Sequence, residues 1–513
     1  MNIGELLTSH KVAVVQTEPR YPCTPPYDPS EPFPEYKGPV SQEDNPAYRG
    51  VREVFHMLGL DAEHFDTPQW NPLRGLIHPG NVVIIKPNWV SHKNHGDRDY
   101  GLTDTDSLIT HGAVLRAVLD YVCMALQGEG KVIVGDAPIQ NTDWEALLRL
   151  TGILEILESI RRRFPGIHLE VCDFRLEHAL VRGRRIVAKR RREPFPEEFL
   201  EVDLGDKSLL IPLMRNGKFA FGVANYPRWR MVRAHNLEHN LYLFPRKVLE
   251  ADVLINVPKV KTHLKAGITC ALKNFVGINA MKDYLPHFRF GSPKRGGDEY
   301  PDKNWLWDLR WWLAHKEWER DSGFFKTLLW AMEGAAGLAL RLLFRYPKGY
   351  GSVAGGGWWG NDTLWRTILD INRAFFYYDR SSGRISVNPT RSVRYLAIAD
   401  GLISGHRESP LSPTPLKTGW VLAGWNPVAM DTVVAALLGF DFRKIPQVAK
   451  AYEIQELPLA LFRPEEIEIL GIPGVSKVYD IYTKGVFIAA EPSLGWKGHV
   501  EYHNSEGKVS RHD

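Results

Sequence analysis

The chain has 513 residues, of which 44% are hydrophobic and 24% are charged. This composition is typical of a globular protein and excludes the disordered, collagen-like and coiled-coil classes. The formal net charge of +4 is small for a chain of this size, so we expect no specific nucleic-acid partner.

The cysteines and the start of the chain bear on cofactors and compartment. The four cysteines, Cys23, Cys123, Cys172 and Cys270, form no CxxC pair, so we expect neither a zinc ribbon nor an iron–sulfur cluster. The first residues lack the basic and apolar regions of a secretory signal, and charged residues interrupt the apolar stretch 324–344. We therefore expect a cytoplasmic protein.

Apolar runs that are typical of buried strands alternate with helical patterns along most of the chain. In chain order, the strand-like runs are KVAVVQ, NVVIIKPN, KVIVGDAP, HLEVCDF, DVLINVPK, RYLAIADG and WVLAGW. Helical spacing is found in HGAVLRAVLDYVCMAL and in NPVAMDTVVAALLG, where Asn426 suits an N-cap and Pro427 the first turn. This alternation predicts an α/β fold with a mostly parallel sheet flanked by helices.

Three regions interrupt the alternation. Residues 17–48 are rich in proline and predict an irregular segment wrapped over the surface. Residues 181–193, VRGRRIVAKRRRE, predict an Arg-rich hairpin, which either faces solvent or contacts a polyanion. Residues 285–390 hold nine of the 16 tryptophans and predict a helical, Trp-rich insertion. Its aromatic residues either form a core or, within residues 300–365, provide a substrate lid, a partner surface or a membrane-surface contact.

These boundaries divide the chain into five parts. They are an N-terminal strand with a Pro-rich wrap (1–80), the first part of an α/β core (81–284), the Trp-rich insertion (285–390), the second part of the core (391–445) and a C-terminal extension (446–513). We expect the two core parts to form one α/β unit.

Polar residues follow several of the predicted strands, where ligands bind in open α/β sheets. Lys86 and Asn88 follow one strand, Asp136 follows the next, and Asp400 follows a later one. Because parallel strands end at one edge of a sheet, we expect these side chains to line one crevice.

The densest polar cluster lies in NVPKVKTHLKAGITCALKNFVG. A helix that begins near Thr262 would place Lys265, Thr269 and Lys273 on one face. Lysines beside helix N-terminal amides would bind an anion, such as a carboxylate or a phosphate. Alternatively, a desolvated lysine acts as a base or nucleophile and His263 transfers a proton, or the lysine face is only solvated.

Asp431 lies in an otherwise apolar predicted helix, so its carboxylate needs a partner. The partner is a backbone amide, a lysine or a hard cation such as magnesium. Together with Asp136 and Asp400, Asp431 forms our candidate set for a divalent cation. The spacing of His92 and His95 matches no specific metal motif.

Several of these segments, in order over residues 81–442, resemble the domain of unknown function 362 family. The segments are IIKPNWV, LTDTDSLITHGAVLRAVLDYV, KVIVGDAP, ADVLINVPKVKTHLKAGITCALKNFVGI, IADGLISGH and NPVAMD, where Asn426 replaces a usually acidic residue. The family has no general assigned reaction, and this chain lacks the ferredoxin-like cysteine module that many members carry. The resemblance points to the polar residues Lys86, Asn88, Asp104, Asp136, Lys261, His263, Thr269, Lys273, Asn274, Asp400 and Asp431.

We therefore predict an enzyme that binds an anionic small molecule. The residues expected to act in catalysis are Lys261, His263 and Lys273, those expected to bind the ligand are Lys86, Asn88, Thr269 and Asn274, and those expected to hold a divalent cation are Asp136, Asp400 and Asp431. The reaction is either proton transfer, as in an isomerase or lyase, or a magnesium-assisted transfer. The alternative is a non-catalytic protein that contacts a membrane surface or a partner through the Trp-rich insertion and the Arg-rich hairpin.

Overall fold

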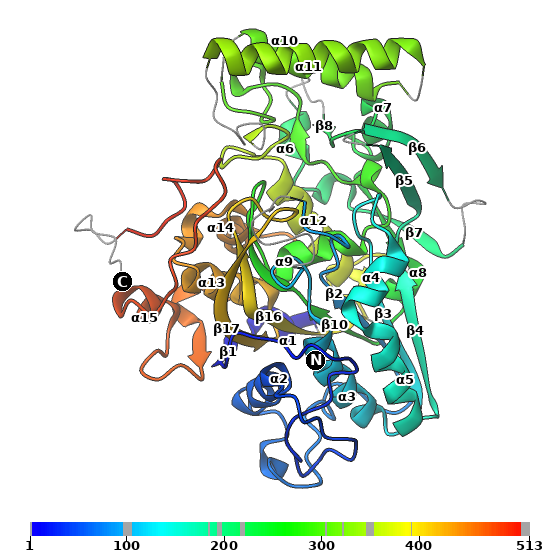
Figure 1. Ribbon diagram of the computed structural model, residues 1–513, viewed down its shortest axis with the longest axis vertical. Helices are drawn as coiled ribbons and strands as arrows, with labels where there is room; N and C mark the ends of the chain where they lie inside the picture. Colours follow the sequence, from blue (N-terminus) through cyan, green and yellow to red (C-terminus); the bar gives the residue numbers. More distant parts are fainter. Residues whose placement is uncertain are drawn as a thin grey trace.

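A computed structural model of the chain describes residues 3–95, 105–182, 185–191, 197–215, 221–302, 305–320, 323–344, 353–390 and 392–503. A ten-stranded sheet lies at its centre (Figure 1). The strands are β1 (Lys11–Gln16), β2 (Val82–Pro87), β3 (Gly130–Asp136), β4 (Ile167–Asp173), β10 (Val253–Val257), β11 (Lys259–His263), β12 (Gly267–Thr269), β16 (Arg394–His406), β17 (Thr414–Gly424) and β18 (Glu468–Leu470).

The sheet order is β18-β1-β17-β16-β10-β2-β3-β4, and β11 joins it through β16 and carries β12. The strands β16, β10, β2, β3 and β4 are parallel, whereas β17 is antiparallel to both β16 and β1. The predicted α/β fold with a mostly parallel sheet is therefore confirmed. The strands β1 and β18, from the two ends of the chain, also belong to this sheet.

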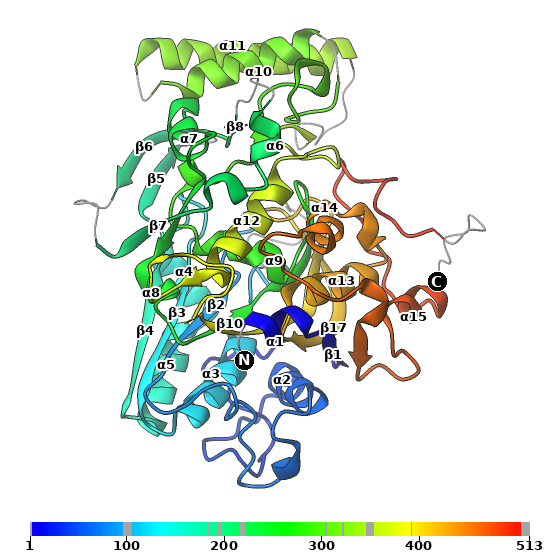
Figure 2. The same cartoon turned by 180° about the vertical axis from the view of Figure 1, so that it is seen from behind.

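Helices cover both faces of the sheet (Figures 1 and 2). One side carries α2 (Pro46–Met57), α3 (Gly112–Leu126) and α5 (Ile153–Arg163), and the other carries α9 (Ala271–Asn274), α12 (Leu364–Phe376) and α13 (Pro427–Leu437). Each face of the sheet has its own hydrophobic core, the first under α2, α3 and α5 and the second under α9, α12 and α13. In β2, Val83 and Ile85 belong to the first core and Ile84 belongs to the second. Strands buried on both faces need apolar residues at every position, which explains their continuous apolar runs.

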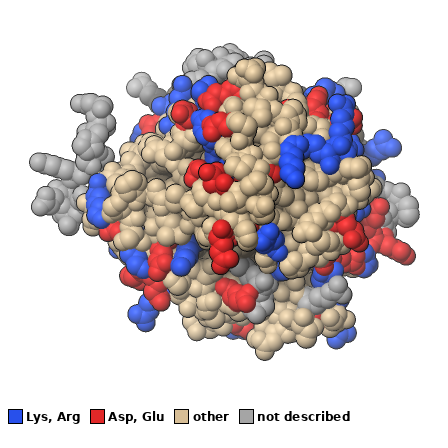
Figure 3. Space-filling model, turned by 90° about the horizontal axis from the view of Figure 1, so that it is seen from below, with Lys and Arg blue, Asp and Glu red and all other residues tan. Residues whose placement is uncertain are grey.

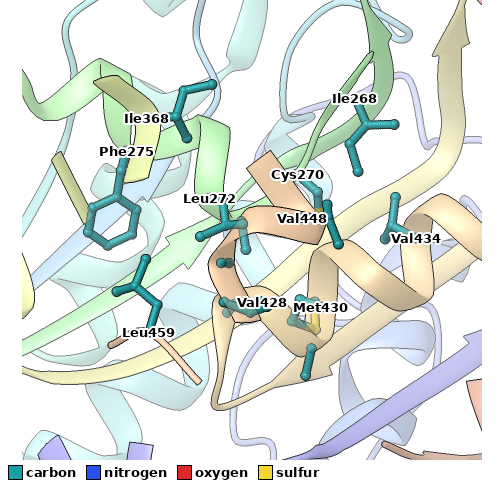
Figure 4. Close-up of a cluster of buried hydrophobic side chains, with 14 of the residues drawn as sticks. Ile268, Cys270, Leu272, Phe275, Ile368, Val428, Met430, Val434, Val448 and Leu459 are labelled. Carbon is teal, nitrogen blue, oxygen red and sulfur yellow. The ribbon is translucent and has the colours of Figure 1, made fainter. Parts of the chain in front are cut away.

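The second core anchors the segment that follows β11 (Figure 4). Ile268, Cys270, Leu272 and Phe275 are fully buried and pack with side chains of α12 and α13. The predicted N-cap of α13 is confirmed, because the Oδ1 atom of Asn426 accepts from the Val428 N–H at 2.8 Å.

The prediction of a helix that begins near Thr262 is wrong. Residues Lys259–His263 and Gly267–Thr269 form the antiparallel β11–β12 hairpin, and β11 also pairs with β16. Gly267 has a φ of +81°, which favours glycine and ends any helical path. Lys265, Thr269 and Lys273 therefore do not share a helical face, and α9 is a single turn followed by a 3-10 helix, Phe275–Ile278.

The Trp-rich region contains α10 (Trp305–Trp318), α11 (Phe324–Phe344) and α12, and it gives no described strand to the large sheet. Its strands β13 (Phe288–Arg289), β14 (Tyr378–Asp379) and β15 (Arg384–Ile385) lie in two-stranded sheets. The predicted Arg-rich hairpin is formed by β5 (Glu177–Arg182) and β6 (Arg185–Arg191). None of the helices in the described part is long and apolar enough to cross a bilayer.

The remaining elements connect these layers. They are α1 (Ile3–Thr8), α4 (Trp144–Thr151), α6 (Ile211–Met214), α7 (Arg228–Ala234), α8 (Arg246–Leu249), α14 (Pro446–Ala449), α15 (Val478–Thr483), β7 (Phe199–Asp203), β8 (Phe221–Gly222) and β9 (Leu241–Pro245). The predicted irregular segment 17–48 contains no helix or strand over residues 17–45, but its last three residues belong to α2, which begins at Pro46.

Candidate functional site

The ends of β2 and β3 bring a lysine and an aspartate together. The Nζ atom of Lys86 lies 2.8 Å from Oδ1 of Asp136, and both side chains are buried. The Oδ1 atom of Asn274 accepts from Lys86 Nζ at 3.1 Å and from Asn88 Nδ2 at 2.9 Å. Burial lowers the pKa of Lys86, whereas the charge of Asp136 acts in the opposite direction.

The 3-10 helix Phe275–Ile278 lies directly on this ion pair. A Cβ atom at Gly277 would be 2.1 Å from Oδ1 of Asp136 and 2.7 Å from Nζ of Lys86. Only glycine fits there, so the close approach explains the glycine of the KNFVG motif.

Asp400 lies in a separate buried network, in the middle of β16 and opposite Lys259 at the start of β11. Its carboxylate contacts Lys259 Nζ at 3.1 Å and accepts from the Tyr21 hydroxyl at 2.5 Å and the His111 N–H at 2.9 Å. Tyr21 comes from the Pro-rich segment, which thereby closes over this part of the sheet. These contacts of Asp400 hold the Pro-rich segment and the start of α3 against the sheet.

Asp431 lies in a third environment, between α13 and α9. Its Oδ1 atom accepts from the Leu272 N–H at 3.3 Å, while Oδ2 has no hydrogen-bond partner among the described residues. Burial raises the pKa of Asp431 to about 7. The three aspartates that we considered for a divalent cation therefore lie apart. Within the described ranges, no cluster of three or more His, Cys, Asp or Glu could hold a metal ion.

A cavity of about 470 Å³ lies next to the Lys86–Asp136 pair, with Lys273 and Val276 of the intervening segment in its wall. Its described lining contains three lysines, three histidines and no aspartate or glutamate. These basic residues are Lys265, Lys273, Lys282, His95, His263 and His287. The wall is therefore strongly biased toward positive charge.

The three cavity lysines lack acidic partners within the described structure. None of them forms an ion pair or a side-chain hydrogen bond there, and Lys265 Nζ lies 5.8 Å from the Phe288 ring. Burial, Lys282 and Lys265 lower the pKa of Lys273 to about 7. Burial also lowers the pKa of Lys265 and of Lys282 to about 8.

The histidines offer both a donor and an acceptor. The Nδ1 atom of His263 accepts from the Lys265 N–H at 3.0 Å, so the neutral ring carries its proton on Nε2. The Nδ1 atom of His287 lies 2.7 Å from the Leu285 carbonyl, so this ring donates from Nδ1 and leaves Nε2 as an acceptor. Burial lowers both pKa values well below the usual range, which keeps both rings neutral near pH 7.

Six of the predicted site residues fall into two groups in or beside the cavity. His263 and Lys273 line the cavity, and Lys86, Asn88, Asp136 and Asn274 form the layer beneath it. Lys261 and Thr269 are buried opposite each other in the β11–β12 hairpin, and Lys261 Nζ donates to the Leu108 carbonyl. Asp104 lies outside the described residues.

Sequence reasoning missed Lys282 and His287 as cavity residues. Both follow the KNFVG motif in a segment of 3-10 turns and loops, where no period marks a common face. The density of basic residues between Lys259 and His287 was the available signal.

Comparison with known protein families identifies the class of this region. The family model named domain of unknown function, DUF362, matches residues 215–436. The match includes the β11–β12 hairpin and Lys273, and it confirms the resemblance expected from the motifs. Within these residues the chain is similar to the DUF362 family.

A solved structure, of a protein from Thermotoga maritima determined as a structural genomics target, is similar at 13% identity and a TM-score of 0.29. The similarity covers 73% of this chain and 55% of that protein, so the chain spans about half the length of its neighbour. None of the curated proteins compared with the chain matches it.

Proposed function

We propose that this protein is an enzyme that binds a small anion, a carboxylate or a phosphate, in the cavity between the β11–β12 hairpin and Lys282. The observation that carries this proposal is the charge of the lining, which has three lysines without acidic partners and no carboxylate among its described residues. A ligand of opposite charge would relieve the repulsion among these lysines.

The layer beneath the cavity supports this reading. The charge of Asp136 acts on Lys273 and Lys282, but Asp136 is already paired with Lys86. The Lys86 ammonium thus neutralises the Asp136 carboxylate, which would otherwise offset the positive charge of the cavity lysines. The cavity keeps its positive potential for a ligand.

Proton transfer is the chemistry that the residues favour. An amine with a pKa near 7, like that of Lys273, is present in both protonation states at neutral pH and can accept or give a proton. The His263 Nε2–H is a neutral donor that can stabilise charge developing on a ligand oxygen. A magnesium-assisted transfer has less support, because Asp136, Asp400 and Asp431 are absent from the lining.

The test compares the effect of phosphate on the melting temperature of matched variants. Phosphate should raise the melting temperature of the wild type more than chloride at equal ionic strength, because it binds the folded state. Lys273→Met should lose this difference, whereas Lys294→Met, which removes an exposed lysine on a 3-10 turn, should keep it. An equal phosphate response in Lys273→Met and in the wild type would contradict the proposal.

A further inference from the structure

The helices α10 and α11 lie side by side across one end of the longest axis of the molecule (Figures 1 and 2). A small core of their own, with Leu306, Trp307, Leu313, Ala336 and Leu340, holds the two helices together. Their outer sides are not covered by any described part of the chain.

Two charged side chains of α11, those of Lys326 and Glu333, face the neighbouring helix α10 instead of solvent. Glu333 Oε1 lies 2.6 Å from Arg310 Nε, and Lys326 Nζ lies 3.4 Å from Glu317 Oε1. Both partners belong to α10. Lys326 is only 9% exposed. Lys326 and Glu333 are therefore paired with α10 and add no charge to the outer side of α11.

The outer side of α11 consists of large apolar residues instead. Phe324 is 76% exposed and Leu342 is 71% exposed, although each would normally be buried. The exposed large side chains are Phe324, Phe325, Leu328, Trp330, Met332, Leu338, Leu342 and Leu343, together with Trp305, Leu309 and Trp312 of α10. Contiguous apolar surface of this kind marks an interaction site.

The shape of this surface indicates what covers it. At about 100° per residue, the exposed apolar positions of α11 span an arc of about 220° around the helix axis. A helix that docks in a protein groove presents a narrower stripe, with anchors at i, i+3, i+4 and i+7. An arc as wide as this one suits immersion in a fluid apolar layer.

Charge indicates the kind of layer. Residues 305–344 contain five Lys or Arg and five Asp or Glu, so the helix pair is neutral. Among the side chains of α11 that the structure describes, none on the exposed arc is charged. Attraction to anionic lipids therefore adds little, and insertion of apolar and tryptophan side chains provides the binding energy.

We propose that α10 and α11 dock on the surface of a zwitterionic lipid bilayer, with α11 lying in the plane of the interface. The helix does not cross the bilayer, in agreement with the lack of a spanning helix in the described part. This inference is independent of the proposed anion cavity, because it uses none of the cavity residues.

Flotation of the full chain with phosphatidylcholine vesicles tests this proposal. The wild type should float with the vesicles, and the bound fraction should change little between 0.1 M and 1 M salt, values chosen because exposed charges are screened in this range. Phe325→Glu/Leu342→Glu should bind at least about tenfold less, since a charge at the interface is costly. The control, Leu237→Glu/Leu461→Glu, changes two equally exposed leucines elsewhere and should bind like the wild type.

Three results would overturn the inference. The first is a wild type that does not float with the vesicles, or a Phe325→Glu/Leu342→Glu variant that floats as the wild type does. The second is binding only to anionic vesicles, lost at high salt, which would assign the contact to electrostatic attraction. The third is a wild-type dimer that the double variant converts to a monomer, which would make a second copy the occupant. An unchanged melting temperature shows that each variant is folded, and Phe324→Ser, a milder variant, should also bind less than the wild type.

Discussion

At the residue scale, the proposed anion site predicts that binding is coupled to protonation of the cavity lysines. In the free protein, a pKa of about 7 leaves Lys273 mostly neutral at pH 8, and Lys265 and Lys282 are then about half protonated. A bound anion favours the ammonium forms and raises these pKa values. Binding must therefore take up protons near pH 8.

Calorimetric titration with sulfate, which does not titrate in this range, measures the uptake in buffers of different ionisation enthalpy. We expect net proton uptake at pH 8 and little at pH 6, where all three lysines are already protonated. The affinity should accordingly fall as the pH rises from 6 to 9. Equal proton uptake at pH 6 and pH 8 would argue against these lysines as the binding groups.

The buried Lys86–Asp136 pair has a structural role that Lys86→Met would expose. Removal of the ammonium leaves a buried carboxylate with only backbone N–H donors, those of Trp89 and Ala137. We expect a loss of about 3–5 kcal/mol in the free energy of unfolding, measured by urea denaturation. Lys131→Met on the neighbouring strand, which breaks a half-exposed pair with Glu170, should cost at most about 1 kcal/mol. Similar costs for both variants would refute the buried pair.

At the element scale, the strands were predictable and the β11–β12 hairpin was not. The seven apolar runs are long enough and continuous enough to specify buried parallel strands. In the segment from Thr262 to Lys273, however, the i, i+4 spacing of polar residues also fits a helix. Pairing of β11 with β16, about 140 residues away in sequence, decides for the strand, and local pattern contains no information about this pairing.

The same limit applies to the candidate site. Lys86, Asn88 and Asp136 could be placed together because parallel strands end at one edge of the sheet. Lys282 and His287 lie in loops whose path depends on tertiary packing, so their position in the cavity could not be predicted from the sequence.

Asn426, at the start of α13, has a role that an aspartate would not fill. Its Nδ2 atom donates to the carbonyls of Leu6 and Leu459, at 2.9 Å each, while Oδ1 caps the helix. Asn426→Asp removes both donors and should reduce the free energy of unfolding by about 1–3 kcal/mol. The loss should be smaller at pH 4 than at pH 8, because a protonated carboxyl can still donate one hydrogen bond. A variant as stable as the wild type at pH 8 would contradict this role.

At the scale of the whole molecule, the two ends of the long axis differ in surface character. Figure 3, seen from the end opposite α10 and α11, shows acidic and basic side chains intermixed over the surface. The α10–α11 end carries large apolar side chains instead. The cavity of the proposed anion site is lined by residues of the β11–β12 hairpin and of the segment that follows it, such as His263, Lys273 and Lys282.

The most direct test of the anion cavity is a crystal structure of the protein soaked in selenate, whose selenium gives an anomalous signal. We expect an anomalous peak inside the cavity at hydrogen-bond distance, about 3 Å, from Nζ of Lys273 and from Nζ of Lys265 or Lys282. The peak should be absent in Lys273→Met crystals soaked in the same way. An empty cavity in the wild type, with Lys273 turned toward open solvent, would contradict the account.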